Sequence, residues 1–186
     1  VRNQNIFKNG FVPGSIFIGL NGGFAPWVGA ILKDINIKIL LVCEEGQAKE
    51  AIMRLSRVGF DNCLGFLDGG FKTWQNSRNP IETIDSNNAN EFEKSINDNI
   101  NILDVRQVGE RNNEYLKNSE HIPLALLNDD DKSLNKSLKY YIHCAGGYRS
   151  MIACSILKKK GFDNIIDVEG GFGSISNNTS LEILRN

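Results

Sequence analysis

The sequence has few of the residues from which metal sites and disulfide frameworks are built. Its 186 residues include 4 cysteines and 2 histidines, without a C-x-x-C, H-x-H or H-E-x-x-H spacing. This composition gives a zinc site no support, and we expect neither a metal nor another cofactor. Four cysteines would also make a sparse disulfide framework for this length. We therefore expect free thiols in a reducing cytoplasm.

An excess of charge of one sign is also missing. Lysine and arginine number 21 against 22 acidic residues, which gives a net charge of −1. Binding to a nucleic-acid backbone needs an excess of positive charge, so nucleic acid is not an expected partner. The hydrophobic fraction of 41% is ordinary for a globular protein.

Long hydrophobic runs are absent as well. No run approaches the ~20 residues of a membrane helix, so we expect no membrane partner. The strongest run, Ile35–Val42, is broken by Asn36 and Lys38 and predicts a strand. The amino terminus lacks the zones of a signal peptide. It begins with valine, which suggests a start inside a longer protein.

An internal repeat organises what is there. The segment I-L-L-V-C-E-E-G at 39–46 resembles K-Y-Y-I-H-C-A-G-G at 139–147. Further along, V-G-F-D-N-C-L-G-F-L-D-G-G-F at 58–71 resembles K-G-F-D-N-I-I-D-V-E-G-G-F at 160–172. The offsets agree, so two copies of a unit of about 100 residues account for almost the whole chain.

Each copy has the pattern of alternating strands and helices. In the second, the apolar segments 101–105, 139–143 and Ile165–Val168 predict strands. Arg149–Lys160 places apolar residues at helical spacing, and Gly170-Gly171 permits a tight turn into a final short helix. Strands separated by helices favour the α/β class, with a mainly parallel sheet covered by helices on both faces in each unit.

The boundary between the copies is visible in the composition. N-S-R-N-P at 76–80 closes the first, and D-S-N-N-A-N-E at 85–91 holds a capping box that opens a helix. We therefore predict domains at 1–80 and 84–186. The acidic run at 129–131 predicts a solvated turn.

The first copy is shorter at its start. Val1-Arg2 aligns with Val105-Arg106, which stands near the end of the second unit's first strand. We therefore expect the first unit to lack its own opening strand.

The sharpest motif is C-A-G-G-Y-R at 144–149, between a predicted strand and a predicted helix. In that position a cysteine faces converging backbone N–H groups, which stabilise an anion and favour the thiolate over the thiol. Gly146 and Gly147 tolerate the dihedral angles that a tight ring of amides needs. Arg149 adds a forked cationic donor for an oxyanion.

These residues resemble the rhodanese family of sulfurtransferases, over nearly the whole chain as two tandem rhodanese-like units. The second unit carries the marks D-V-R at 104–106, H-I-P at 121–123, C-A-G-G-Y-R-S at 144–150 and G-F-D-N…E-G-G-F at 161–172. The resemblance implies that Cys144 takes sulfane sulfur from thiosulfate or a persulfide. A thiol or cyanide-like acceptor would then remove the sulfur from the Cys144 persulfide.

The same resemblance assigns the site. Cys144 and Arg149 would be catalytic, and the substrate would be bound by the loop residues Ala145, Gly146, Gly147, Tyr148 and Ser150. The loop and the tandem arrangement look most like the C-terminal part of bacterial proteins that fuse a metallo-β-lactamase-type hydrolase or persulfide dioxygenase to rhodanese units. Such an N-terminal domain would be a partner in a longer protein, and its metal site is not among these residues.

Two other functions stay open. Cys144 to Arg149 forms a C-x4-R loop, whereas the related Cys-dependent phosphatases use C-x5-R, whose wider ring admits a phosphate. Phosphatase activity is therefore the less favoured alternative. A non-catalytic module that docks a partner or senses redox state is the other alternative, with Cys144 as a vestige or a sensor.

The first unit has the signs of an inactive copy. Cys43 stands where Cys144 does, but Glu44 and Glu45 follow it and place negative charge where an anion should bind. Ala48 replaces the arginine of the loop. We therefore predict a buried strand-end cysteine in a structural or partner-binding half.

Several polar residues and thiols near the motif receive structural interpretations. Alternation along a strand points His143 away from the face of Cys144. Asp104 and Arg106 are expected to form a structural ion pair. Cys63 is predicted to lie in the core. Cys154 stands too many helical turns beyond the loop to pair with the nucleophile.

Overall fold

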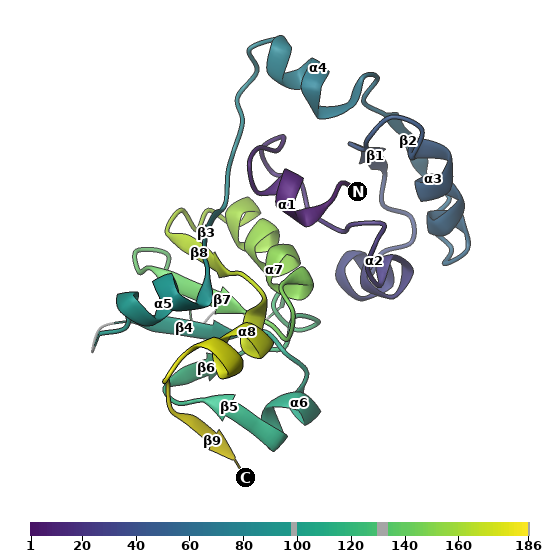
Figure 1. Cartoon of the computed structure of the whole chain (residues 1–186). Coiled ribbons are helices and arrows are strands. Elements are labelled where there is room, and N and C mark those ends of the chain that lie inside the picture. Colours follow the sequence, from purple (N-terminus) through teal and green to yellow (C-terminus); the bar gives the residue numbers. More distant parts are fainter. Residues whose placement is uncertain (98–99, 130–133, 186) are drawn as a thin grey trace. The chain divides into compact units, whose positions relative to one another are not determined.

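The structure is a computed structural model that describes residues 1–97, 100–129 and 134–185 (Figure 1). The chain divides into two compact units, Val1–Thr83 and Ile84–Asn186. The predicted solvated turn at 129–131 falls mostly outside the described residues.

The second unit is built on a five-stranded sheet in the order β3-β8-β7-β4-β6. All its pairs are parallel, with Ile102 beside Tyr141 and Tyr141 beside Ile166. The strands are β3 (Asp85–Asn87), β4 (Asn101–Asp104), β6 (Ser119–His121), β7 (Tyr140–His143) and β8 (Ile165–Val168). Neighbouring strands are mostly distant in sequence, as the alternation of strands and helices predicted.

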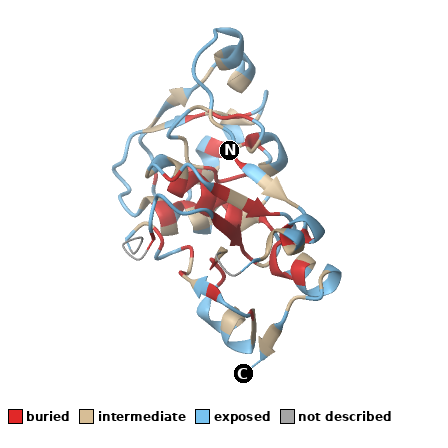
Figure 2. Ribbon diagram, turned by 90° about the vertical axis from the view of Figure 1, so that its left-hand side faces the viewer, coloured by how far each residue is buried: buried red, intermediate tan, exposed pale blue. Residues whose placement is uncertain are grey.

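Helices cover both faces of this sheet, as Figure 1 shows. The helices are α5 (Ala89–Ser95), α7 (Tyr148–Lys159) and α8 (Gly171–Asn178). On one face, Phe92 of α5 and Phe172 of α8 form a buried cluster with Tyr141 of β7. Helix α7 packs against β7 and β8 from the opposite face. Figure 2 shows the buried residues concentrated in these central elements.

The local signals at the helix ends act as the sequence predicted. Asn88 and Glu91 form the capping box of α5, with each side chain accepting the other residue's backbone N–H. Lys158 and Lys159 occupy the last turn of α7. Gly161 follows that helix with a φ of +86°, a left-handed conformation that favours glycine.

Besides the short edge strands β3 and β6, two further parts of the second unit were not predicted. Helix α6 (Val108–Asn113) follows β4 and begins with a capping box between Gln107 and Glu110. Strands β5 (Glu114–Leu116) and β9 (Ile183–Arg185) then form a separate antiparallel pair.

The first unit contains a smaller sheet. Its elements are α1 (Gln4–Phe7), α2 (Phe24–Leu32), β1 (Ile39–Leu41), α3 (Ala48–Ser56), β2 (Cys63–Phe66) and α4 (Gly70–Asn76). Strands β1 and β2 are parallel. The strand predicted over Ile35–Val42 is shorter, because a turn occupies its start. There, Asn36 N–H donates to the Asp34 carboxylate (2.9 Å) and Ile37 N–H donates to the Asp34 carbonyl (3.2 Å).

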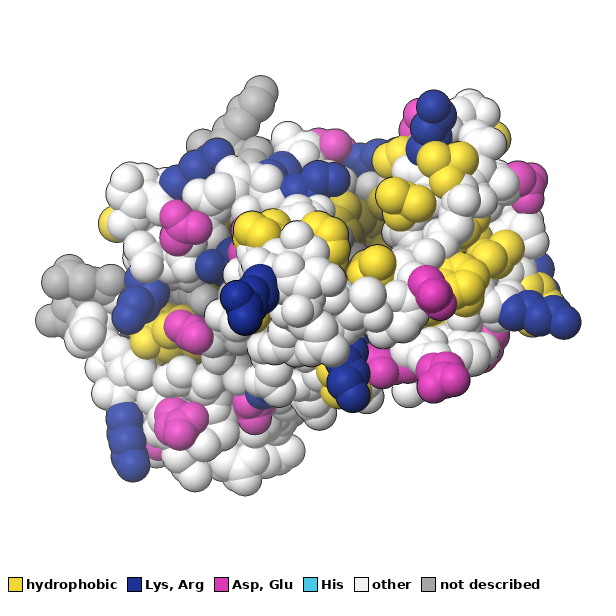
Figure 3. Space-filling view, turned by 90° about the horizontal axis from the view of Figure 1, so that it is seen from above, with side chains coloured by type: hydrophobic (Ala, Val, Ile, Leu, Met, Phe, Trp, Pro, Cys, Tyr) yellow, Lys and Arg dark blue, Asp and Glu magenta, His cyan; other side chains and the backbone are white. Residues whose placement is uncertain are grey.

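One face of the first unit's sheet remains open to solvent. Leu40, Leu64 and Phe66 are 74%, 62% and 51% exposed. In the repeat alignment, Leu40 corresponds to Tyr141 and Phe66 to Val168, which are buried in the second unit. The prediction that Cys63 lies in the core was wrong, since this residue is half-buried in the thin sheet. Hydrophobic side chains at the surface form the yellow areas of Figure 3.

The start of the chain repeats the second unit contact for contact. The Val1 amino group donates to the Val42 carbonyl at 2.9 Å, and Val105 N–H donates to the His143 carbonyl at 2.9 Å. The guanidinium carbon of Arg2 lies 4.3 Å from the ring centre of Phe71, and that of Arg106 lies 3.9 Å from the ring centre of Phe172. These contacts support the alignment of Val1-Arg2 with Val105-Arg106. That the first unit lacks an opening strand stays a prediction.

Candidate active site

Cys144 lies where β7 ends and the loop to α7 begins. Its Sγ accepts a hydrogen bond from the Gly147 N–H at 3.1 Å, and the thiol lies 3.7 Å from the Ser150 Oγ. Ser150 in turn donates to the Gly147 carbonyl at 3.1 Å. The side chain therefore points into its own loop, at the amino end of the helix, where backbone N–H groups favour an anion.

The two glycines of the loop have different roles. Gly147 adopts a φ of +95° and caps α7 without a side-chain hydrogen bond. Gly146 is exposed and has no left-handed φ, and a Cβ added there would meet nothing within 4 Å. Of the two glycines, only Gly147 needs the left-handed backbone that favours glycine, although the sequence suggested this need at both positions.

The G-G-F motif closes the loop from the other side. Phe172 N–H donates to the Cys144 carbonyl at 2.6 Å, and Gly173 N–H donates to the Ala145 carbonyl at 3.0 Å. These bonds hold the first loop residues against the start of α8. From the sequence we predicted only a turn at this motif. The signal that could have revealed the contact is the repetition of the same motif after Cys43.

Arg149 is engaged by a partner that the sequence interpretation missed. Its two terminal nitrogens lie 2.5 and 2.6 Å from the two carboxylate oxygens of Glu110. The two side chains are 15% and 34% exposed. Hydrogen bonds from Arg149 lower the pKa of Glu110, and hydrogen bonds to Glu110 raise the pKa of Arg149, with a smaller contribution from Cys144. The Q-x-x-E spacing at 107–110 was the available signal, since it fixes Glu110 at the start of α6.

A buried ion cluster lies behind the loop. The Asp104 Oδ2 lies 2.8 Å from Nη2 of Arg106 and 3.3 Å from Nη1 of Arg111. Burial opposes ionisation of Asp104, but hydrogen bonds from Arg106 hold its pKa below the usual value. The predicted structural ion pair of Asp104 and Arg106 is confirmed.

His143 and Cys154 are both buried near the loop. The His143 ring is fully buried, with Nδ1 3.4 Å from the Cys144 carbonyl oxygen, and burial lowers its pKa to about 4. It is therefore neutral near pH 7. Burial raises the pKa of Cys154 well above its usual value, which keeps that thiol protonated and unreactive.

The first unit keeps the framework of this loop with different side chains. Gly46 has a φ of +79°, which matches Gly147, and α3 begins at Ala48. Burial raises the pKa of the Cys43 thiol, and the charge of Glu44 adds to that effect. This loop therefore favours a protonated thiol.

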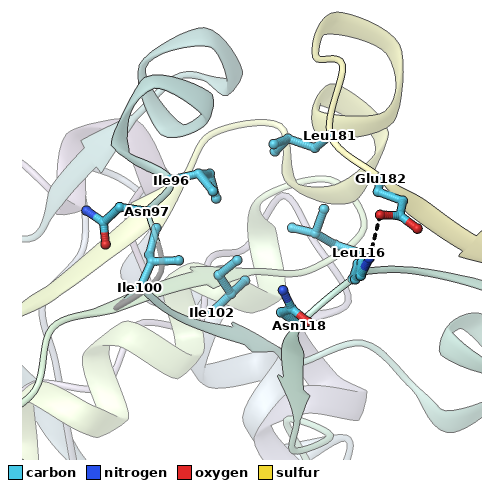
Figure 4. A pocket seen from close by; sticks show the side chains of 9 residues that line it. Ile96, Asn97, Ile100, Ile102, Leu116, Asn118, Leu181 and Glu182 are labelled. Carbon is cyan, nitrogen blue, oxygen red and sulfur yellow. Dashed lines mark hydrogen bonds and ion pairs between the residues drawn. The ribbon is translucent and has the colours of Figure 1, made fainter.

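A separate pocket lies in the second unit. This pocket of about 520 Å³ lies between Ile96, Ile100, Leu116 and Leu181, with the ion pair of Lys117 and Glu182 on its lining (Figure 4). None of its lining residues belongs to the loop of Cys144. In the described ranges, no group of three or more His, Cys, Asp or Glu side chains could hold a metal ion. No helix in the described part of the chain is both long and apolar enough to span a membrane.

The fold and the loop together define a class of protein. It is a parallel α/β unit in which a cysteine ends a central strand, points toward a loop amide and is followed by an arginine in a C-x4-R spacing. The Rhodanese-like domain model matches residues 1–77 and 88–178. The chain therefore belongs to the rhodanese-like domain family, with two units in tandem, as its sequence indicated.

Individual relatives agree with this assignment. YrkF of Bacillus subtilis, provisionally named a sulfur carrier protein, is 38% identical over 72 residues, which are 39% of this chain and 39% of YrkF. YqhL of the same organism, named as uncharacterized, is 28% identical over 38% of this chain and 56% of its own. The chain thus spans about half or less of these relatives. A rhodanese-related protein from Thermoplasma volcanium has a TM-score of 0.50 at 34% identity, covering 54% of this chain and 97% of that one. The family, together with the provisional name of YrkF, supports a sulfur-related rhodanese function in general.

Proposed function

We propose that the chain is a sulfurtransferase that moves sulfane sulfur through a persulfide on Cys144. The donor would be thiosulfate or a persulfide, and the acceptor would be a thiophilic group such as a thiol or cyanide. The observation that carries the proposal is the hydrogen bond from the Gly147 N–H to the Cys144 Sγ at 3.1 Å. It supports a loop that holds ionised sulfur at a helix amino terminus.

The proposed reaction has two displacements. The Cys144 thiolate attacks the outer sulfur of thiosulfate, the sulfur–sulfur bond breaks, and its electron pair leaves with sulfite. With a persulfide donor, the leaving group is the donor's thiolate. Cyanide then attacks the outer sulfur of the Cys144 persulfide, takes it as thiocyanate and returns the thiolate.

An assay with a matched control tests this function. The purified chain is given thiosulfate and cyanide, thiocyanate is measured, and the protein is weighed by mass spectrometry for one added sulfur atom. Cys144→Ser is expected to lose both signals, and Cys43→Ser is expected to keep them. A Cys144→Ser variant that still forms thiocyanate at the wild-type rate would disprove the assignment of the nucleophile.

The first unit is proposed to be non-catalytic. The carboxylates of Glu44 and Glu45, the raised pKa of Cys43 and the alanine at position 48 all oppose an anionic sulfur donor there. Its role would be structural or partner-binding. The Cys43→Ser control measures this directly.

A non-catalytic second unit is the alternative that one observation favours. Cys144 is only 1% exposed, which fits a vestigial thiol, whereas a redox-sensing thiol would need access to solvent. This alternative predicts no persulfide with either class of donor. A phosphatase has less support, because the C-x4-R ring is small and Glu110 already occupies the arginine. Hydrolysis of an aryl phosphate would reverse that ranking.

A further inference from the structure

Glu110 takes up the hydrogen-bonding face of Arg149 that an oxyanion would need. Both terminal nitrogens of the guanidinium are used, at 2.5 and 2.6 Å, in a two-pronged pair with the carboxylate. This geometry is the one by which arginine also binds sulfonate-like and phosphate oxygens. A carboxylate of the protein therefore holds the two terminal nitrogens with which Arg149 would otherwise bind the oxygens of a donor.

The position of Glu110 is fixed from its own side. Its Oε2 also accepts the Gln107 N–H at 2.9 Å, as part of the capping box of α6. The carboxylate is thus held by a helix terminus as well as by Arg149. An incoming anion would have to displace an anchored group rather than a freely rotating one.

The charges around Cys144 make the ion pair of Arg149 and Glu110 relevant to the choice of sulfur donor. Arg149 carries one positive charge, Glu110 cancels it, and a Cys144 thiolate leaves the loop with a net negative charge. Thiosulfate is a dianion whose oxygens need the arginine. A persulfide carries at most one charge on its reacting sulfur and requires only the loop amides.

We propose that Glu110 determines donor specificity, turning the loop of Cys144 away from thiosulfate and toward persulfides by occupying Arg149. This proposal rests on the proposed function and names its substrate class. Glu110 acts through Arg149 and is a positioning residue rather than a catalytic one.

The main test compares two donors in one variant. In Glu110→Gln the amide oxygen can still accept the Gln107 N–H, but the charge is lost. We expect kcat/KM for thiosulfate to rise about tenfold, the order of one charged hydrogen bond, while kcat/KM for glutathione persulfide changes by less than about threefold. Glu182→Gln, which removes an equal charge from the exposed pair with Lys117, is expected to leave the ratio unchanged.

A second measurement separates the ion pair from general effects on folding. In a Cys144→Ser background, where no sulfur can be transferred, calorimetry is expected to show tighter thiosulfate binding after Glu110→Gln. Adding Arg149→Met should abolish that gain, because the effect passes through the guanidinium. A merely structural role of Glu110 would not produce this dependence on Arg149.

The outcomes are distinct. If wild-type protein forms no Cys144 persulfide from either donor, the proposed function fails and the specificity proposal fails with it. If the persulfide forms but Glu110→Gln leaves the ratio of the two donors unchanged, or raises both alike, only the specificity proposal is overturned. Thiosulfate affinity that does not respond to Glu110→Gln in the serine background also overturns it.

Discussion

Gly171 lies so close to Cys144 that a Cβ on it would stand 2.4 Å from the Cys144 carbonyl oxygen. Its φ of +57° is also left-handed. The first unit repeats the relationship, since a Cβ on Gly70 would stand 2.6 Å from the carbonyl oxygen of Cys43. The second glycine of each G-G-F motif is therefore required by its contact with the cysteine loop as well as by its turn.

Gly171→Ala is expected to damage both stability and sulfur transfer. The left-handed backbone costs about 1–2 kcal/mol for alanine, and the clash with the carbonyl adds to it and displaces the loop. Gly173→Ala is the control, because its Cβ would meet the Ala145 carbonyl oxygen at 3.4 Å without a left-handed φ. Calorimetry and thiocyanate formation measure the two effects. Equal losses in both variants would contradict the contact as the cause.

Replacing the two loop glycines should separate their roles. Gly147→Ala forces alanine into a φ of +95° and is expected to lower the free energy of unfolding by about 1–2 kcal/mol. Gly146→Ala meets open space and should cost less than half as much. Denaturant unfolding of both variants gives the comparison, and a larger loss at Gly146 would count against the described loop.

Asp104→Asn is expected to destabilise the second unit strongly. The substitution leaves the buried Arg106 and the half-buried Arg111 without their counter-charge, and breaking a buried ion pair typically costs about 3–5 kcal/mol. Replacing Glu182, which forms an exposed ion pair with Lys117, should lower the free energy of unfolding by less than about 1 kcal/mol. Thermal unfolding of Asp104→Asn and Glu182→Gln tests this. Similar shifts in Tm for the two would show that the buried cluster is not an anchor.

His143 is expected to make stability fall in mild acid. Its folded pKa of about 4 lies below the ordinary value of 6.5, so the unfolded chain binds the proton first as pH falls. The stabilising contribution is complete above pH 6.5 and is lost progressively toward pH 4, by about 2 kcal/mol between pH 7 and 5. His143→Asn should lose this part of the pH dependence. Urea unfolding at the two pH values would contradict the idea if both proteins responded alike.

Much of the second unit followed from its sequence because the signals are local. The apolar segments became β4, β7 and β8, and the capping box at Asn88 opened α5. The repeat also placed Cys43 and Cys144 at equivalent strand ends. Such features depend on hydrophobic patterning and on neighbours within a few residues.

The remainder depended on contacts between distant residues. Glu110 and Arg149 are 39 positions apart, and nothing near Arg149 announces a carboxylate partner. The pairing of β5 with β9 likewise joins segments too short to show an alternating pattern. In the first unit, the turn at Asp34 shortened a predicted strand, because local hydrogen bonds competed with the sheet.

The closeness of Gly70 to Cys43 means that the first unit keeps the backbone arrangement that surrounds Cys144 in the second. The backbone arrangement of the loop is thus kept in both units even though its side chains differ. Four of the five residues after each cysteine differ between the two units, whereas the third is glycine in both, with a φ of +79° at Gly46 and +95° at Gly147. Each residue of the C-x4-R segment in the second unit can therefore be compared with its counterpart in the first unit of the same polypeptide.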